Sequence, residues 1–440
     1  MRLPFRRAVR DAVGAMTACG RLYTPIPEMP PCTPATPPSR NDRPVSRSLV
    51  MVRARTALSP RAAMACVLLA MMPTAASASQ SEIFLDPAPE TQGMAPPQAY
   101  PSVQGRVLGY VENANFFGVK GPGATGLPSS WHTVDPFLQG AAVARLSPRW
   151  TLSGLAELRA FGNDPGDRAF ETLDGQLRNL FLSYDAGAVS YFAGKFEVGL
   201  GEAWESMDGI YSGFSGDYAY PGSLGAGARW SLRRSDSASH TVTAIVFKRD
   251  NTTLGQTWFN NYPSQPDSAD GGPANTPGLQ SGGIAYDIGN IPGLDGLRAG
   301  ATVARLGAGQ GDARSQTALE AHINYERPLG DGMGLRLFAE AVHMRGFLGR
   351  QAAATDTIAA VSLSAGRWLY TIAAAQRNLQ ALSGSLSTQG FSDSRDWGVS
   401  GTVAYQTDIG VIVQAGLLRQ QEQGVTFNQG LLRFIFQTSL

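Results

Sequence analysis

From about residue 104 to the C-terminus, apolar and polar side chains alternate along segments of about ten residues. Clusters of Gly, Asp, Asn and Pro separate these segments from one another. A period of two is typical of a β-strand with one apolar and one polar face. We find no helix-length stretch with the period of an amphipathic helix in this part of the chain. The pattern therefore restricts the fold to the all-β class.

Two segments illustrate the alternation. The first places Leu319, Ala321, Ile323 and Tyr325 on one face and Ala318, Glu320, His322 and Asn324 on the other. The second places Trp397, Val399, Val403 and Tyr405 on one face, against Ser400 and Thr402. The second apolar face is aromatic at both ends and aliphatic between them. Outer-membrane barrels have this distribution, because aromatic girdles lie at the two membrane interfaces.

The charge distribution separates the N-terminal segment from the rest. Residues 1–78 carry 11 Arg, no Lys and three acidic residues, although the whole chain has a net charge of only +1. The remaining chain has 25 basic and 32 acidic residues, a net charge of −7, and its basic residues include only three Lys. A soluble β-sandwich also alternates, but its water-facing side usually carries many Lys and Glu. Bulk charge gives no reason to expect a nucleic-acid partner.

The N-terminal segment resembles a secretion signal. Residues 51–78 contain arginines, then the apolar run 62–72, then the small-residue cleavage site Ala76-Ser77-Ala78. We predict a signal peptide at 51–78 and a mature start at Ser79. Residues 1–50 are interpreted as an unstructured extension or a wrongly assigned start, and residues 79–103 as a Pro-rich periplasmic tail.

The predicted mature chain contains no cysteine, because all three, Cys19, Cys32 and Cys66, lie before residue 79. It also contains no later apolar stretch long enough for a transmembrane helix, which needs about 18 residues. Two destinations therefore remain for an exported chain of this kind: the periplasm, or an outer membrane crossed by a barrel.

The connections between segments favour the barrel, because long and short ones alternate. Sixteen candidate strands start near residues 104, 137, 150, 177, 188, 223, 239, 280, 297, 314, 333, 356, 367, 395, 409 and 426. The long connections are 113–135, 162–176, 198–222, 250–279, 307–313, 346–355, 379–394 and 420–425. Short periplasmic turns, longer outer loops and an even strand count characterise bacterial outer-membrane barrels. We predict a transmembrane antiparallel β-barrel over residues 104–440 with sixteen strands, fourteen or eighteen being the alternatives.

The segment GKFEVGLGEAWESMDGIYSGFSGDYAYPG, residues 194–222, resembles the passage in porins where the chain leaves a strand and folds into the channel. The last segment also resembles the terminal strand of outer-membrane proteins, with Leu432, Phe434 and Phe436 on one face, although Leu440 replaces the usual terminal aromatic residue. The chain thus resembles the Gram-negative porin superfamily of the sixteen-stranded general type, without an identifiable subfamily.

This resemblance implies a passive diffusion channel for small hydrophilic solutes and ions, located in the cell outer membrane. It also implies a third outer loop inside the lumen, a homotrimer, contact with membrane lipid, and recognition of the C-terminal strand by the barrel-assembly machinery. It implies no cofactor and no enzymatic activity.

The candidate pore constriction combines an acidic loop with a basic wall. The residues are Glu202, Glu205, Asp208 and Asp217 on the loop and Arg159, Arg229 and Arg233 on the wall. Carboxylates at a constriction attract cations, so we expect a modest cation preference. Two interpretations without a role in the pore stay open. In one, the acidic residues are solvated charges of a surface loop. In the other, the arginines only form ion pairs with Glu157, Glu320 and Glu340 that stabilise the wall. Aromatic residues of the loop, including Tyr218 and Tyr220, are expected to hold it against the wall rather than to bind sugars.

Signals of catalysis are weak. The four histidines, His132, His240, His322 and His343, show no metal-ligand spacing, and we expect no metal site. Two alternatives to a plain channel remain. One is an outer-membrane hydrolase of the lipase type with a closed lumen, for which Ser239 and His240 are the adjacent candidate pair. The other is a substrate-specific transporter in which residues 79–103 form a plug.

Overall fold

The computed structural model describes part of the chain. The described residues run from 99 to 439, with gaps at 122–123, 125, 162–165, 204–206, 208, 210–212, 233–237, 260–267 and 383–393. The predicted extension at 1–50 and the signal peptide at 51–78 lie outside them, as does nearly all of the Pro-rich tail. No helix among the described residues has the length and apolar character that crossing a membrane requires.

The described chain is almost entirely β-structure. Its sixteen long strands are β1 Ser102–Lys120, β2 Ser130–Arg145, β3 Trp150–Ala160, β5 Leu173–Asp185, β6 Val189–Gly199, β7 Ala219–Leu232, β8 Ser239–Arg249, β9 Ser281–Gly289, β10 Leu297–Leu306, β11 Gln316–Gly330, β12 Met333–Arg345, β13 Ala352–Ala365, β14 Trp368–Ala381, β15 Ser394–Gln406, β16 Ile412–Glu422 and β17 Val425–Ser439. The short elements are β4 Arg168–Ala169 and the 3-10 turns η3 Gly213–Asp217, η4 Thr253–Gly255, η5 Ser268–Asp270 and η6 Phe347–Gly349.

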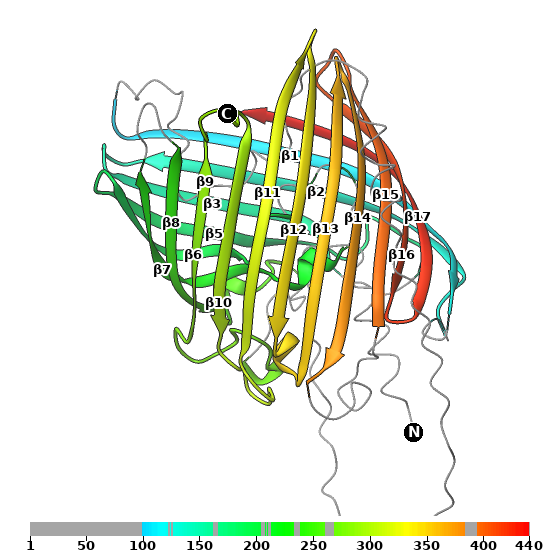
Figure 1. Cartoon of the computed structure of the whole chain (residues 1–440), viewed down its shortest axis with the longest axis horizontal. Coiled ribbons are helices and arrows are strands. Elements are labelled where there is room, and N and C mark those ends of the chain that lie inside the picture. Colours follow the sequence, from blue (N-terminus) through cyan, green and yellow to red (C-terminus); the bar gives the residue numbers. More distant parts are fainter. Residues whose placement is uncertain are drawn as a thin grey trace, which may run out of the picture. The chain divides into compact units, whose positions relative to one another are not determined.

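The strands form a closed barrel (Figure 1). Each long strand pairs antiparallel with its neighbours along the chain, and β1 pairs with both β2 and β17. The seam between β1 and β17 runs from Arg106 opposite Ser439 to Lys120 opposite Thr426. Closure leaves no long strand with an unpaired edge. A barrel of sixteen strands is too wide for side chains to fill, so the interior is available to water and to a loop.

The predicted strand count is confirmed, and most strands begin within four residues of the predicted positions. The first connection differs, because β1 continues to Lys120 and β2 already begins at Ser130. The predicted connection 113–135 includes Asn113 and Asn115, and asparagine is depleted in strands. In the structure both residues lie within β1 and pair with β2, and Pro136 lies within β2 opposite Val111.

Alternation places apolar side chains outside and polar ones inside. On β11, Leu319 is 57% exposed on the outer face, whereas the adjacent Glu320 is only 1% exposed. β12 repeats this distribution, with Leu337 exposed and Arg336 and Glu340 buried. A soluble protein has the opposite arrangement, whereas a barrel with an apolar outer band and a polar interior suits a bilayer.

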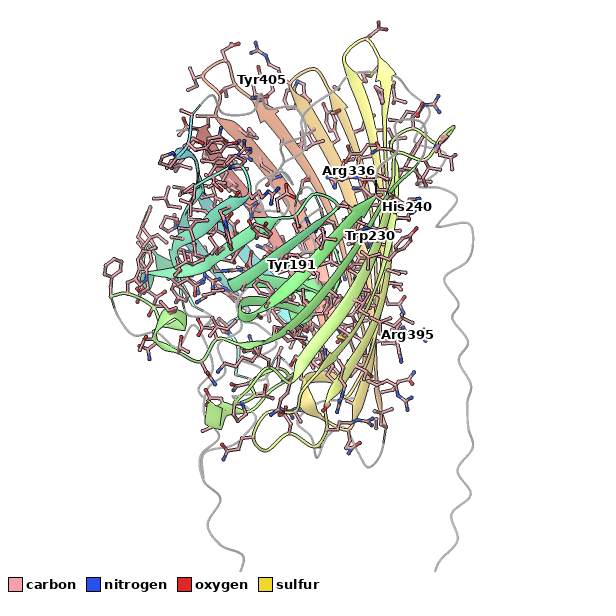
Figure 2. The ribbon with its side chains drawn as sticks, turned by 90° about the vertical axis from the view of Figure 1, so that its left-hand side faces the viewer. Tyr191, Trp230, His240, Arg336, Arg395 and Tyr405 are labelled. Atoms are coloured by element: carbon pink, nitrogen blue, oxygen red, sulfur yellow. The ribbon has the colours of Figure 1, made fainter. Side chains whose placement is uncertain are left out.

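Exposed aromatic residues gather where the strands meet the short turns. Trp150 at the start of β3 packs on Tyr184 at the end of β5, with 4.8 Å between ring centroids. Trp368 at the start of β14 packs on Tyr405 at the end of β15, at 4.7 Å. Tyr191 lies near the start of β6, after the β5–β6 turn, and Trp230 lies near the end of β7, before the β7–β8 connection. Both can be followed with Tyr405 in Figure 2. These rings form one of the two interfacial aromatic belts expected of a transmembrane barrel.

The second long connection also joins the barrel. Its short strand β4 pairs in parallel with β2, where Arg168 lies opposite Thr133. The Arg168 guanidinium donates to both carboxylate oxygens of Asp135, at 3.2 and 2.9 Å. This loop is therefore attached to the rim of the barrel by backbone pairing and by the ion pair between Arg168 and Asp135.

Candidate functional site

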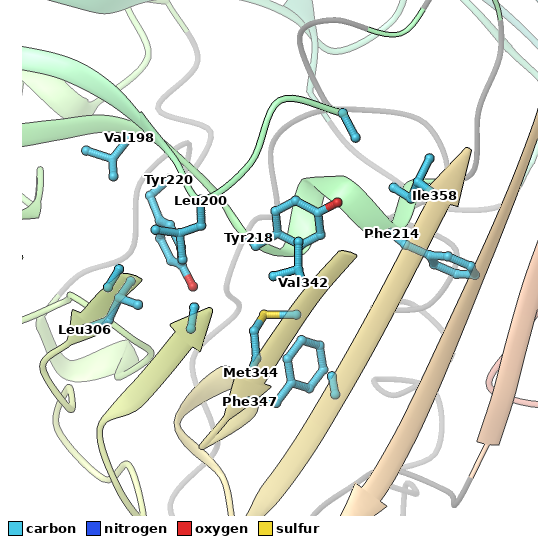
Figure 3. Close-up of a cluster of buried hydrophobic side chains, with 14 of the residues drawn as sticks. Val198, Leu200, Phe214, Tyr218, Tyr220, Leu306, Val342, Met344, Phe347 and Ile358 are labelled. Carbon is cyan, nitrogen blue, oxygen red and sulfur yellow. The ribbon is translucent and has the colours of Figure 1, made fainter. Parts of the chain in front are cut away.

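The described residues of the third long loop, between β6 and β7, lie against the inner wall of the barrel; they are 200–203, 207, 209 and 213–218. Its apolar residues are buried in a cluster with inward-facing side chains of the wall (Figure 3). From the loop come Leu200, Ala203, Phe214 and Tyr218, and from the wall come Val342, Met344 and Ile358. The predicted inward folding of the loop is confirmed. The described aromatic residues of the loop are buried, in agreement with a role in fixing it to the wall.

Glu340, on the inner face of β12, holds the start and the end of this loop together. Its Oε2 accepts hydrogen bonds from the backbone N–H groups of Glu202 and Ala203, the latter at 2.9 Å. Tyr218 Oη donates to its Oε1 at 2.6 Å. The burial of Tyr218 raises the pKa of its hydroxyl well above the usual value, so the hydroxyl stays protonated and can donate. A Cβ at Gly201 would collide with the Glu340 carboxylate at 2.5 Å, which explains the glycine there.

Arg377, on the inner face of β14, fixes the 3-10 turn η3 of the same loop. Its guanidinium forms two 2.8 Å bonds with Asp356 on β13, which lies opposite it in the strand register. It also donates to the backbone oxygen of Phe214 at 2.8 Å and to the Asp217 carboxylate. The loop is therefore held by a buried cation that satisfies acids on the wall and on the loop at once.

A second charged group lies half a barrel away, on β3, β5 and β6. Arg159 contacts Glu157 at 2.9 Å, and Arg178 contacts Glu157 at 3.0 Å and also Glu197. All four side chains are buried. Buried ion pairs of this kind neutralise one another. The basic wall expected from the sequence is therefore, on these strands, a ladder of alternating charges.

A third group connects the start of the loop to the wall between the other two. His322 on β11 contacts Glu320 through Nδ1 at 2.8 Å and Glu202 through Nε2 at 3.4 Å. Asp287 on β9 lies 3.7 Å from the same Nε2. The side chains of Glu202 and Asp287 are 39% and 43% exposed, so two carboxylates in this group meet solvent.

The predicted constriction residues have different environments in the structure. Glu202 belongs to the histidine group, and Arg229 on β7 donates to Thr243 at 3.4 Å and interacts with the charge of Asp287. Asp217 and Arg159 are buried in ion pairs, and this burial does not fit side chains that present open charge to solutes. Glu205, Asp208 and Arg233 lie outside the described residues.

Sequence reasoning did not name Asp287 or Arg377, and it considered Glu340 only as a partner of wall arginines and not as a residue that holds the loop. Each lies on the inward parity of its strand, which is a signal that the sequence contains. The alternation along a strand shows that a charged side chain faces the lumen, but it does not show which of the inward-facing charged residues contacts a loop.

The adjacent Ser239 and His240 each contact a different residue. His240 Nδ1 contacts the Tyr286 hydroxyl at 2.8 Å, and Ser239 Oγ accepts from the Asn290 amide at 3.2 Å. These contacts lie at the turn end of the barrel and point the two side chains toward different partners.

Comparison with solved structures agrees with this geometry. OprB of Pseudomonas putida superimposes with a TM-score of 0.50 at 13% sequence identity, covering 76% of this chain and 94% of that chain. The chain has the fold of the outer-membrane porins. Matches with this porin fold also include a BenF-like porin from Pseudomonas fluorescens, with a TM-score of 0.46, 10% identity and coverage of 77% and 99%. OmpF of Salmonella typhi, solved with daunomycin, has a TM-score of 0.46 and 12% sequence identity, covering 77% of this chain and 97% of that chain.

At such low identity the likeness concerns the porin fold and not the solute. No protein-family model matches the chain, and no curated protein matches it significantly.

Proposed function

We propose that the chain is a passive diffusion channel of an outer membrane, which admits small hydrophilic solutes and ions by size exclusion. The observation that carries this proposal is the third loop, which lies inside a closed sixteen-stranded barrel and is held by Glu340 and Arg377. In this proposal the loop narrows the lumen and leaves a water-filled passage beside it. Such a constriction selects by size and charge and requires neither a cofactor nor covalent chemistry.

We propose further that the constriction prefers cations modestly. Arg159 and Arg178 are neutralised by Glu157 and Glu197, so they add little open positive charge. Glu202 remains partly exposed at the start of the loop, and we assign Glu205 and Asp208 of the same loop to the pore surface. Asp217 acts in this proposal as a loop-fixing residue. Exposed carboxylates in a narrow pore with low-dielectric walls concentrate cations.

The cellular setting of the channel rests on the sequence. We propose that residues 51–78 direct export and are removed, that the mature chain begins near Ser79, and that residues 79–103 form a periplasmic tail. The C-terminal strand presents Leu432, Phe434 and Phe436 outward, all partly exposed, as a signal for barrel assembly. A homotrimer surrounded by lipid is the proposed assembly.

Planar-bilayer recording of the purified, folded protein tests the channel. We expect long-lived openings and a reversal potential of the sign that indicates cation preference in a salt gradient. Folded protein without any conductance would contradict the channel. An anion-selective channel would contradict only the charge assignment.

A further inference from the structure

The group around His322 has features that a channel constriction does not require. His322 is fixed by Glu320, whose Oε1 lies 2.8 Å from Nδ1 and whose side chain is fully buried. This contact directs the Nδ1 proton toward Glu320 and leaves Nε2 as the atom that faces Glu202 and Asp287. A carboxylate behind an imidazole, which sets its tautomer and orientation, is the usual support of a histidine that binds a metal ion.

The separations between the three facing donor atoms are close to those of a metal site. His322 Nε2 lies 3.4 Å from Glu202 Oε1 and 3.7 Å from Asp287 Oδ1, and all three atoms lie within 4.8 Å of one another. In a tetrahedral zinc site with bonds of about 2.0–2.1 Å, neighbouring donor atoms are roughly 3.3–3.4 Å apart. One ion therefore fits between these atoms after small side-chain movements.

Gly300 provides the space for this arrangement. It lies on β10 directly between Asp287 and His322 in the strand register. A Cβ at this position would come within 2.4 Å of the His322 ring and within 2.5 Å of Asp287 Oδ1. Any other residue at 300 would thus push the two donors apart.

A buried carboxylate oxygen beside the histidine favours additional positive charge at this site. Glu320 Oε2 is fully buried and has no hydrogen-bond partner within the described part of the chain. Leaving a charged oxygen unsatisfied in the interior is costly. A cation bound to His322 would lower that cost through the imidazole, because it increases the positive charge that the Nδ1 proton presents to Glu320.

We propose that Glu202, Asp287 and His322 bind one divalent transition-metal ion, with zinc as the probe, and that Glu320 positions the histidine. One imidazole and two carboxylates are ligands that Zn²⁺ accepts, and three protein ligands leave a position for water. Since Glu202 belongs to the third loop and the other two ligands belong to β9 and β11, the ion joins the loop to a second stretch of wall. The competing occupants are an imidazolium form of His322 and the guanidinium of Arg229, which interacts with Asp287.

The test is a zinc titration of the full chain, folded in detergent, in competition with a chromophoric chelator. We expect one Zn²⁺ per chain. His322→Gln and Glu202→Gln should each weaken binding by at least ~10-fold, since each removes a ligand. The matched control is His343→Gln, because His343 lies exposed on the outer face of β12 and contacts Thr355. Wild-type protein that binds no zinc, or ligand variants that bind as tightly as the control, would overturn the proposal.

Two further variants separate the site from general folding effects. Glu320→Gln keeps the shape of the supporting side chain, and we expect a 10- to 100-fold loss of zinc affinity as for other supporting carboxylates. Glu202→Gln lies on the loop, so the β-sheet circular dichroism of the folded barrel should not change. The titration does not depend on conductance, so a failed metal site and a failed channel give different results.

Discussion

Arg377 and Asp217 form an ion pair across 160 residues of sequence, with side chains that are only 3% and 1% exposed. The pair joins the inner face of β14 to the 3-10 turn of the third loop. Removal of one member of a buried pair leaves the other charge without compensation. The 3-10 turn of the loop is therefore held by one guanidinium, which also satisfies Asp356, whereas Glu340 holds the start of the loop.

Arg377→Met should destabilise the barrel by about 3–5 kcal/mol, since it leaves Asp217 and Asp356 buried without their cation. The loop should also detach from β14, which should increase current noise and mean conductance. Urea unfolding in lipid vesicles and single-channel recording measure the two effects. Arg367→Met is the matched control, because Arg367 and its partner Asp408 are exposed. Equal stability of the two variants would show that the Arg377 ion pairs do not hold the loop.

The variant Glu202→Gln/Asp287→Asn should move the reversal potential toward zero in buffers that contain EDTA. Both side chains keep their size and lose their charge, so conductance should change less than selectivity. The effect should weaken above about 0.1 M salt, where the Debye length is ~10 Å. Asp295→Asn, in the exposed turn between β9 and β10, should leave the potential unchanged. A wild-type reversal potential in the double variant at low salt would remove these carboxylates from the ion path.

Leu417→Arg should destabilise the membrane-inserted barrel by about 2–4 kcal/mol, because a charge would replace an apolar side chain near the middle of the outer face. Leu417 is 64% exposed and lies in the centre of β16. Ile409→Arg is the control, since Ile409 is 85% exposed in the turn before β16 and already meets water. Unfolding free energies in vesicles distinguish the two, and similar values would mean that this face of β16 does not contact lipid.

The environment of Asp312 predicts that the free energy of unfolding depends on pH. It accepts hydrogen bonds from the backbone N–H groups of Gly272 and Gly309, at 2.9 and 2.8 Å. Burial raises the pKa of its carboxyl above the usual value despite these bonds. The folded state thus binds the proton more tightly than the unfolded state does. The contribution of Asp312 to stability is therefore largest at acid pH and falls as pH rises through the raised pKa.

Asp312→Asn should remove this part of the pH dependence. Urea unfolding of wild type and variant between about pH 3.5 and 7 checks it, since the unfolded carboxyl titrates near pH 3.9. The difference between the two proteins should change with pH in the direction stated. A constant difference across this range would indicate that Asp312 titrates normally.

The barrel could be predicted from the sequence because lipid and lumen impose opposite demands on alternate residues. Leu319 and Glu320 are adjacent, and their exposures differ as the alternation predicts. Strand ends were less predictable where residues such as Asn115 and Pro136, which usually end strands, are paired within β1 and β2.

The contacts of the loop could not be predicted in the same way. Inward parity identifies Glu340 and Arg377 as residues of the inner face, but their partners lie 122 to 163 residues away in the sequence. The histidine group posed the same difficulty. We looked for metal ligands at short spacings, whereas Glu202, Asp287 and His322 come from three separate elements and meet only after the barrel closes.

The seam between β1 and β17 has a consequence for how the chain folds. Arg433 donates to Glu112 across this seam, and 321 residues of sequence separate the two. Contacts between such distant residues form slowly, because the chain between them must first be ordered. Until the seam closes, β1 and β17 each present an unpaired edge that can recruit a strand from another chain. The slowest stage of folding should therefore be the pairing of the first and last strands. At that stage, a high concentration of partly folded barrels should favour aggregation over closure.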